Sequence, residues 1–490
     1  MIKIKANATQ VEISDLLWGS FVEQMGRAIY GGIYDEGHPT ADENGYRQDV
    51  ISAVRALNLP LIRYPGGNFV SGFDWKDSVG ENRPVRMNLA WQQLEPNTIG
   101  LHEFYDWCEK VGSEVMMAIN LGTGTIKDAL ELVEYCNFGG HSTIADERRK
   151  NGKDDPFGFK YWCLGNEMDG IWQICNLPAE EYARKAREVS KLIKIIDPEI
   201  KTTLVGSSGP YIPTYPAWEK TVLEEAYDFV DYISLHLYYS VTPDGKDESF
   251  LAQYKDLERY IETVRDIVKE TKERKKSNHD VYLALDEWNI WKTSNDSSDT
   301  KWLVSDVRLE NVYDFRDTLL FADMVVTMTN YSDCLKIGCL AQLVNVIAPI
   351  MTENGGRMFL QPTYYPFEFA CNHLKGNLLS CEYDSPVITA GEEKYQSLHV
   401  TACENQSEYA MLLVNNNLTE EFDISLEVPE TARKVKICKF MKAALADVNS
   451  FDEPEKVIPK ELACQKEEGA VTLRIPAASI VMLTLEKGDK

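Results

Sequence analysis

Two patterns of apolar and polar residues divide the chain, and the change between them falls near Asn377. Before this point, short apolar runs alternate with segments whose apolar residues recur every three or four positions. The runs are typical of buried parallel strands, and the recurring positions are typical of amphipathic helices. Eight strands are predicted, at Trp18–Gln24, Leu59–Gly67, Glu114–Leu121, Tyr161–Met168, Thr202–Ser208, Tyr232–Tyr239, Tyr282–Asn289 and Leu335–Val346.

Helices are predicted between these strands, most clearly over Ala179–Ile196 and Leu251–Lys272. A third segment, Asn311–Asn330, is apolar on all sides, so we expect it to be more deeply buried. Eight alternating units over roughly 350 residues fit a (β/α)8 TIM barrel better than an open doubly wound sheet. The glycine-rich stretch Gly122–Gly124 lacks the third glycine of a dinucleotide fingerprint and the spacing of a P-loop.

After Asn377 helical spacing disappears and short alternating runs follow, separated by turn-forming residues. This pattern is typical of a β-sandwich, here of jelly-roll type. Residues 2–14 alternate in the same way and are expected to add a strand to it, with a frayed terminus as the alternative. The predicted domains are a catalytic barrel over 15–376 and a β-sandwich formed by 1–14 plus 377–490. The short alternating runs after Asn377 are Tyr409–Asn415, Phe422–Val428, Lys434–Met441, Val471–Ile475 and Ser479–Leu485.

Charge and cysteine usage narrow the class of protein. A net charge of −26 argues against a nucleic-acid partner and against an anionic membrane surface, because both require clustered Lys and Arg. It is compatible with a neutral ligand such as a sugar. Eleven dispersed cysteines without a C-x-x-C pair indicate free thiols in a reducing compartment. With a short, polar N-terminal segment, this predicts a cytoplasmic location.

Two glutamates stand at the ends of predicted strands four and seven. Glu167 follows an apolar strand within Gly165-Asn166-Glu167, and Glu287 follows another within Asp286-Glu287-Trp288. In α/β barrels, residues at the carboxyl ends of strands carry the chemistry. Two facing carboxylates without a metal are what glycoside hydrolysis requires, one as general acid and one as nucleophile or base. We therefore expect neither a cofactor nor a metal ion.

Around these glutamates the sequence resembles the family 51 glycoside hydrolases, mostly α-L-arabinofuranosidases, which are retaining barrel enzymes. The resemblance covers nearly the whole chain and combines several motifs, which makes it specific. The matching stretches are Phe21–Arg27 with Tyr30–Tyr34, Arg63–Gly72, Trp162–Gly170, His236–Tyr238, Asp286–Asn289 and Ala341–Asn345.

The resemblance implies a role for each matching residue. Glu167 would be the acid/base, with a pKa raised by burial and by the second carboxylate. Glu287 would be the nucleophile, kept ionised by supporting residues. Arg63 and Tyr238 are the expected supports, with His236 beside them, although Arg63 also fits a structural ion pair at the barrel rim. The expected sugar-binding residues are Glu23, Asn68, Asn166, Tyr238, Gln342, Trp172 and Trp288.

Two further tryptophans, Trp91 and Trp291, fit either the sugar pocket or core packing. The sequence also departs from the family pattern at three places. Gln24 stands where the family usually has histidine, Cys175-Asn176 replaces a Gly-His pair, and Asn68 occupies a position where some relatives carry cysteine. These departures concern substrate preference more than reaction type.

The predicted function is a retaining exo-glycosidase that removes terminal, non-reducing α-L-arabinofuranosyl residues from arabinose-containing oligosaccharides. Family resemblance further suggests a homo-oligomer, a hexamer or trimer. One alternative is an endo-glucanase or β-xylosidase of the same family, which pocket shape would distinguish. Another is an inactive carbohydrate-binding barrel, against which both glutamates count. A metal-dependent hydrolase is disfavoured because the seven histidines form no H-x-H or H-E-x-x-H motif.

Overall fold

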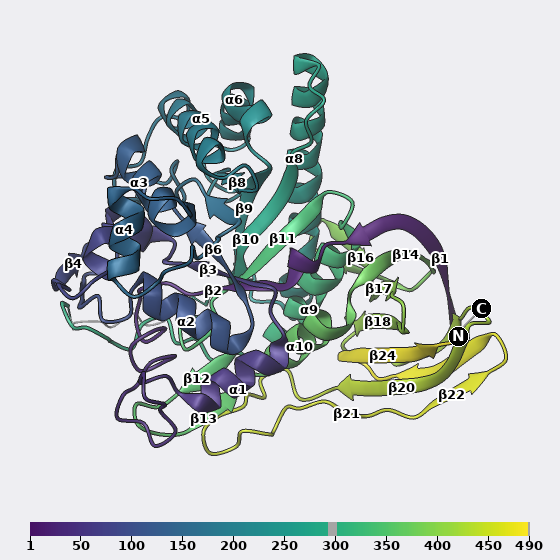
Figure 1. Ribbon diagram of the computed structural model, residues 1–490. Helices are drawn as coiled ribbons and strands as arrows, with labels where there is room; N and C mark the ends of the chain where they lie inside the picture. The colour runs from purple at the N-terminus through teal and green to yellow at the C-terminus, as the bar shows by residue number, and fades with distance from the viewer. Residues whose placement is uncertain (293–300, 489–490) are drawn as a thin grey trace.

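The predicted barrel is confirmed in the computed structural model, which describes residues 1–292 and 301–488. Parts of both predicted domain ranges, 293–300 and 489–490, lie outside the described residues. Eight parallel strands close in the order β10-β11-β2-β3-β6-β7-β8-β9 (Figure 1). Their bounds are β2 Gly19–Phe21, β3 Leu61–Tyr64, β6 Glu114–Ala118, β7 Tyr161–Cys163, β8 Lys201–Leu204, β9 Tyr232–Tyr239, β10 Tyr282–Ile290 and β11 Leu335–Ala341.

Helices surround the barrel and follow the predicted apolar spacing. The predicted helix Ala179–Ile196 is α5, with the same bounds. The second predicted segment is divided between α7 (Asp247–Leu251) and α8 (Tyr254–Lys275). The other helices are α1 Gln48–Leu57, α2 Leu101–Val111, α3 Ile126–Asn137, α4 Thr143–Lys150, α6 Ala217–Ala226, α9 Phe315–Asn330 and α10 Tyr364–His373, with 3-10 turns η1 Asp15–Trp18, η2 Asn68–Gly72, η3 Trp75–Ser78 and η4 Tyr227–Phe229.

The C-terminal region forms one ten-stranded sheet in the order β21-β20-β24-β18-β17-β14-β1-β19-β23-β22. The sheet curls, because β20 and β22 contact each other from near its opposite ends. One apolar core, which includes Val400, Ile424 and Leu483, is enclosed between its faces. Strand bounds are β1 Ile2–Ile13, β14 Gly376–Glu382, β17 Leu398–Glu404, β18 Glu408–Asn415, β19 Phe422–Glu427, β20 Ala432–Met441, β21 Lys460–Glu461, β22 Cys464–Glu467, β23 Ala470–Ile475 and β24 Ser479–Lys487.

The N-terminal strand β1 belongs to this C-terminal sheet. It pairs antiparallel with β14 and parallel with β19, so the expectation that residues 2–14 add a strand is confirmed. The predicted boundaries at 14/15 and 376/377 stay predictions, although β14 begins at Gly376. The described residues also form three two-stranded pairs: β4 (Arg86–Asn88) with β5 (Gln93–Glu95), β12 (Ile350–Thr352) with β13 (Met358–Leu360), and β15 (Val387–Ala390) with β16 (Glu393–Gln396).

Helix α9 joins the barrel to the sheet. It contacts α8, α10 and β10 as well as β14, β17, β18 and β24. Figure 1 shows it between the two parts of the molecule. Its side chains are buried on every face, as the uniformly apolar sequence predicts. The barrel is therefore held against the sheet by a shared helix rather than by a linker. Within 1–292 and 301–488, no helix has the length and apolar character needed to cross a bilayer.

Candidate active site

A narrow pocket opens at the carboxyl ends of the barrel strands, where α/β barrels place their active sites. Both strand-end glutamates reach it, from strands β7 and β10 on different sides of the barrel. Its lining residues are Phe21, Glu23, Met25, Gly67, Asn68, Trp91, Glu167, Tyr238, Glu287, Trp291, Leu309, Gln342 and Ile347.

Glu167 lies in a sharp turn directly after β7. Its own φ is +42°, a left-handed conformation that is strained for a residue with a side chain. The turn is held by the Gly170 N–H, which donates to the Glu167 carbonyl at 2.8 Å. The Glu167 carboxyl accepts a hydrogen bond from Trp172 Nε1 at 2.6 Å and lies 3.1 Å from His236 Nδ1. Burial, together with the charge of Glu287, raises the pKa of Glu167.

Glu287 is surrounded by donors. Arg63 Nη1 donates to its Oε1 at 2.7 Å, and the Tyr238 hydroxyl donates to its Oε2 at 2.8 Å. His236 Nδ1 lies 3.5 Å from the same Oε2. Two cationic groups and a hydroxyl therefore surround this carboxyl group. The two glutamates therefore have different surroundings: Glu167 contacts Trp172 and His236, whereas Glu287 also accepts hydrogen bonds from Arg63 and Tyr238.

A bulge in β10 turns two consecutive acidic side chains toward the barrel interior. The register with β9 shifts between Ala284 and Glu287, so the strict alternation of a strand is interrupted. Asp286 consequently lies beneath Glu287, 3.4 Å from Arg63 Nε and 3.3 Å from His236 Nε2. Burial alone would raise the pKa of Asp286, but Arg63 and His236 lower it below its ordinary value.

His236 is a buried cation at the centre of this network. Burial alone would lower its pKa, but Glu287, Asp286 and Glu167 raise the pKa of His236 to about 10. One oxygen each of Glu167 and Glu287 and one nitrogen of His236 lie within 4.8 Å of one another, close enough to hold a metal ion. A metal would have to displace the proton of His236, since an imidazolium has no free lone pair. The donor set therefore fits a proton better than a metal.

Further amide and carboxyl groups of the site follow strands β2, β3, β7 and β11. Glu23 accepts hydrogen bonds at Oε1 from the Phe69 N–H and from Trp91 Nε1, both at 2.8 Å, and burial raises its pKa to about 7. Gln342 Oε1 accepts from the Glu23 N–H at 3.0 Å. Asn166 Oδ1 accepts from Arg63 Nη2 at 2.7 Å, and Asn166 Nδ2 donates to Asn68 Oδ1 at 3.3 Å.

The structure separates the four candidate tryptophans. Trp172 is half exposed beside Glu167, while Trp91 and Trp291 line the pocket; the Trp291 ring lies edge-on to Tyr238 at 5.3 Å. The prediction that Trp288 binds the sugar is wrong. Trp288 is fully buried on the outer side of β10, with its ring 5.0 Å from that of Phe321 and 6.2 Å from that of Phe367. Strand alternation points it at the helices rather than the pocket.

The residues that depart from the family pattern, Gln24, Cys175, Asn176 and Asn68, lie in different parts of the site. Gln24 Nε2 donates to the Ile99 carbonyl at 2.9 Å, so the side chain supports the wall behind the pocket. Cys175 and Asn176 are exposed beyond Trp172, on the acid/base side of the mouth. Asn68 lines the pocket itself.

Several pocket residues escaped the sequence reasoning. Asp286 was visible only as a neighbour of Glu287, because strict strand alternation would have placed it on the opposite face. The apolar residues Met25, Leu309 and Ile347 lie in loops without periodicity, where no sequence pattern identifies a wall. Positive φ values at Leu309 and Ile347 are a backbone property that the sequence does not reveal.

Known proteins share this architecture. A family model of the α-L-arabinofuranosidase 1 domain matches residues 53–262, and one of the α-L-arabinofuranosidase C-terminal domain matches residues 286–479. The chain is 45% identical over 428 residues, 85% of each chain, to an intracellular exo-α-(1→5)-L-arabinofuranosidase of Acetivibrio thermocellus. It is 39% identical to an exo-α-(1→6)-L-arabinofuranosidase of Bifidobacterium longum, covering 95% of this chain and 93% of that one.

A solved structure of a family 51 α-L-arabinofuranosidase from Bifidobacterium longum superposes with a TM-score of 0.94 at 35% identity, covering 99% of both chains. The similarity therefore extends over nearly the whole chain, in sequence and in fold. The chain therefore belongs to the family 51 α-L-arabinofuranosidases, a family of glycoside hydrolases.

Proposed function

We propose that the protein hydrolyses terminal, non-reducing α-L-arabinofuranosyl residues with retention of configuration, through a covalent glycosyl-enzyme. One observation carries the retaining mechanism: an oxygen of Glu167 and an oxygen of Glu287 lie within 4.8 Å. Retaining enzymes hold their carboxyls about 5–5.5 Å apart, whereas inverting enzymes need roughly 6.5–9.5 Å to admit a water molecule.

Two steps follow from the different surroundings of the glutamates. In the first, a Glu287 oxygen forms a bond to the anomeric carbon, while the Glu167 proton passes to the departing glycosidic oxygen. In the second, Glu167 as carboxylate takes a proton from water, whose oxygen attacks the anomeric carbon and releases Glu287. His236 remains charged through both steps, because its pKa is about 10.

Polar groups of the pocket that lack a protein partner are available to bind the hydroxyls of the furanose ring. The Gln342 Nε2 amide and Glu23 Oε2 have no hydrogen-bond partner within the described part of the chain, although both residues line the pocket. Asn166 and Asn68 add an amide pair next to the acid/base. Hydroxyl-dependent sites of this kind discriminate strongly against sugars without the matching hydroxyl.

Product analysis tests the exo assignment and the linkage. The relatives named above act on (1→5) and (1→6) linkages, according to their names. With linear oligosaccharides of either linkage, we expect free arabinose as the first product from the non-reducing end. An endo-glucanase or β-xylosidase of the same family would leave these arabinosides intact and would instead cleave a β-glucan internally or release xylose from a xylo-oligosaccharide.

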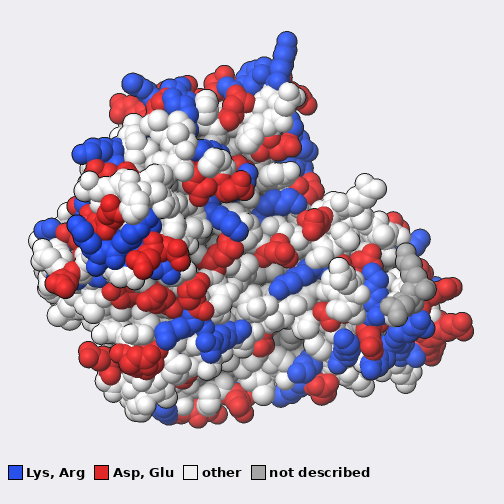
Figure 2. All heavy atoms as spheres, in the orientation of Figure 1, with Lys and Arg blue, Asp and Glu red and all other residues white. Residues whose placement is uncertain are grey.

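We further propose that the substrate is a short oligosaccharide inside the cytoplasm, because curated relatives are named intracellular and all eleven cysteines are free thiols. Acidic and basic side chains are interspersed over the face in Figure 2, which does not favour nucleic acid or an anionic membrane as partner. We propose that the protein forms a homo-oligomer, either a trimer or a hexamer. Sedimentation velocity would measure the mass of this oligomer directly.

The central experiment compares wild type, Glu167→Ala and Glu287→Ala on an aryl α-L-arabinofuranoside with a good leaving group. Glu287→Ala should lose activity by roughly 10⁴-fold or more, because no covalent intermediate forms. Glu167→Ala should form the intermediate and turn it over slowly, since general base catalysis contributes about 10²–10⁴-fold. Azide should rescue Glu167→Ala and give a glycosyl azide of retained configuration.

The azide product also separates the two roles. In Glu287→Ala, azide replaces the missing nucleophile, and NMR should show the inverted azide. Glu455→Ala is the matched control, since this glutamate is exposed and lies outside the barrel mouth. Wild-type activity in Glu287→Ala, or a retained azide from it, would refute the assignment.

A further inference from the structure

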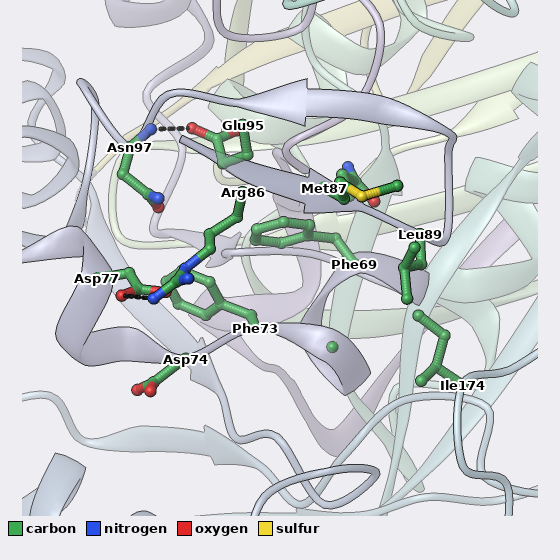
Figure 3. Close-up of a pocket in the computed structure, with 12 residues that line it drawn as sticks. Phe69, Phe73, Asp74, Asp77, Arg86, Met87, Leu89, Glu95, Asn97 and Ile174 are labelled. Carbon is green, nitrogen blue, oxygen red and sulfur yellow. Dashed lines mark hydrogen bonds and ion pairs between the residues drawn. The ribbon is translucent and has the colours of Figure 1, made fainter. Parts of the chain in front are cut away.

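A second cavity, of about 270 Å³, lies beside the catalytic pocket under the β4–β5 hairpin (Figure 3). This size is near the lower end of small-ligand sites, which span roughly 300–1,000 Å³. None of the functions proposed above uses it. Its lining residues are Phe69, Gly72, Phe73, Asp74, Asp77, Arg86, Met87, Asn88, Leu89, Glu95, Asn97 and Ile174.

The cavity and the catalytic pocket are lined by neighbouring residues. Asn68 lines the pocket and its neighbour Phe69 lines the cavity. The turn of the β4–β5 hairpin also contributes to both sites: Leu89 lines the cavity and Trp91 lines the pocket. Asn88 Oδ1 accepts from the Trp91 N–H at 3.2 Å, which ties the two walls together.

One end of the cavity adjoins the acid/base. Figure 3 shows Leu89 and Ile174 near each other at this end, with Asp74 and Asp77 at the other. Ile174 follows Trp172 by two residues, and Trp172 Nε1 donates to Glu167. Glu167 delivers its proton to the leaving oxygen, so the cavity lies on the side to which the leaving group departs.

The lining has the chemistry of a sugar site. Phe69 and Phe73 supply apolar ring faces, with centroids 5.0 Å apart. Both hydrogen bonds of the buried Glu95 carboxyl, from Tyr30 and the Asn97 N–H, fall on Oε1, so Oε2 remains for a ligand. Arg86 binds Asp77 through Nε and Nη2, which leaves Nη1 as a donor. Apolar faces with a few convergent acceptors and donors bind a neutral, hydroxyl-rich ring.

The rim of the cavity is apolar and accessible. Met87 is 58% exposed and Leu89 is 60% exposed, and Trp172, two residues before Ile174 of the lining, is half exposed. Large exposed apolar side chains that gather at one place mark a binding surface rather than a solvated one. The rim is therefore suited to an apolar contact with a further sugar ring.

We propose that this cavity binds the pentose unit on the leaving-group side of the scissile bond, so that it favours oligosaccharides over simple glycosides. The inference rests on the function proposed above. It assigns to Arg86, Phe73 and Glu95 a role in recognising the leaving saccharide, with no part in the chemical steps. Oligosaccharides should gain affinity from the cavity, while an aryl arabinofuranoside should gain nothing.

The test measures kcat/KM of wild type, Arg86→Ala and Phe73→Ala on two substrates, an α-1,5-linked arabinotriose and 4-nitrophenyl α-L-arabinofuranoside. Each variant should lower kcat/KM for arabinotriose by roughly tenfold, mainly through KM, because it removes a contact outside the reacting centre. Activity on the aryl glycoside should stay within about twofold of wild type. Arg259→Ala is the matched control, since Arg259 also forms an exposed ion pair but lies far from the cavity in the fold.

The outcomes separate the two proposals. If wild type hydrolyses the aryl glycoside but the variants treat both substrates alike, the subsite is refuted and the proposed function stands. If wild type acts on neither arabinofuranoside, the proposed function fails, and the subsite fails with it. Equal losses on both substrates would mean that the hairpin only shapes the catalytic pocket, which also overturns the subsite.

Discussion

At the scale of single residues, Asp286 has the least obvious role in the site. It is buried next to Glu287 in the chain, and its charge balances Arg63 and His236. Replacing it with asparagine removes a negative charge near Glu167, so Glu167 should release its proton at a lower pH. We expect the basic limb of the kcat/KM profile to move to lower pH by roughly one unit in Asp286→Asn, with an activity loss of about tenfold.

His236 and Asp286 do not contribute to the pH profile of the wild type in the range of the measurement. The pKa of His236 is about 10 and that of Asp286 lies below its ordinary value of 3.8, so neither group changes charge between these limits. The profile limbs therefore report buried glutamates, Glu167 and Glu23 among them. Asp423→Asn, on the exposed side of β19, is the control. A lower rate with an unmoved profile would show that Asp286 acts only through packing.

At the scale of elements, sequence periodicity predicted the strands but not their local irregularities. All eight barrel strands and α5 follow from apolar spacing, because burial on one or both faces imposes a period on the sequence. The bulge in β10 leaves no such mark. It brings Asp286 and Glu287 inside together and leaves Trp288 against α9, so proximity to Glu287 in the sequence was misleading for Trp288. Trp91 and Trp291 stayed undecided for a related reason, since the loops that hold them have no period.

The turn after β7 can be tested at the same scale. Gly165 has a φ of +98°, and an added Cβ would come within 3.1 Å of Met168 Cγ. Gly165→Ala should cost about 1–3 kcal/mol of stability and displace Glu167, with an activity loss of at least about tenfold. Gly152→Ala is the matched control, because Gly152 has a φ of +95° and nothing within 4 Å. Urea unfolding should show losses in both variants, and activity should fall only in Gly165→Ala. Equal activity in the two would contradict a positioning role for the turn.

At the scale of the whole molecule, the barrel and the sheet meet through a buried polar contact on α9. Asp323 lies 3.0 Å from His399 Nδ1 on β17 and accepts from Asn416 Nδ2 at 2.9 Å. Asp323→Ala leaves two buried partners unpaired, so we expect the free energy of unfolding to fall by about 3 kcal/mol or more. Asp452→Ala is the control: Asp452 pairs with Arg357 at the surface and is 88% exposed, so its loss should cost at most about 1 kcal/mol.

Calorimetry shows whether the barrel and the sheet unfold together or separately. Because the apolar cluster that contains α9 also includes sheet residues such as Leu412 and Ile480, wild type should unfold in one transition, whereas a weakened junction should let the sheet and the barrel melt separately. If Asp323→Ala is as stable as Asp452→Ala and melts in one step, the apolar faces of α9 alone hold the two parts together.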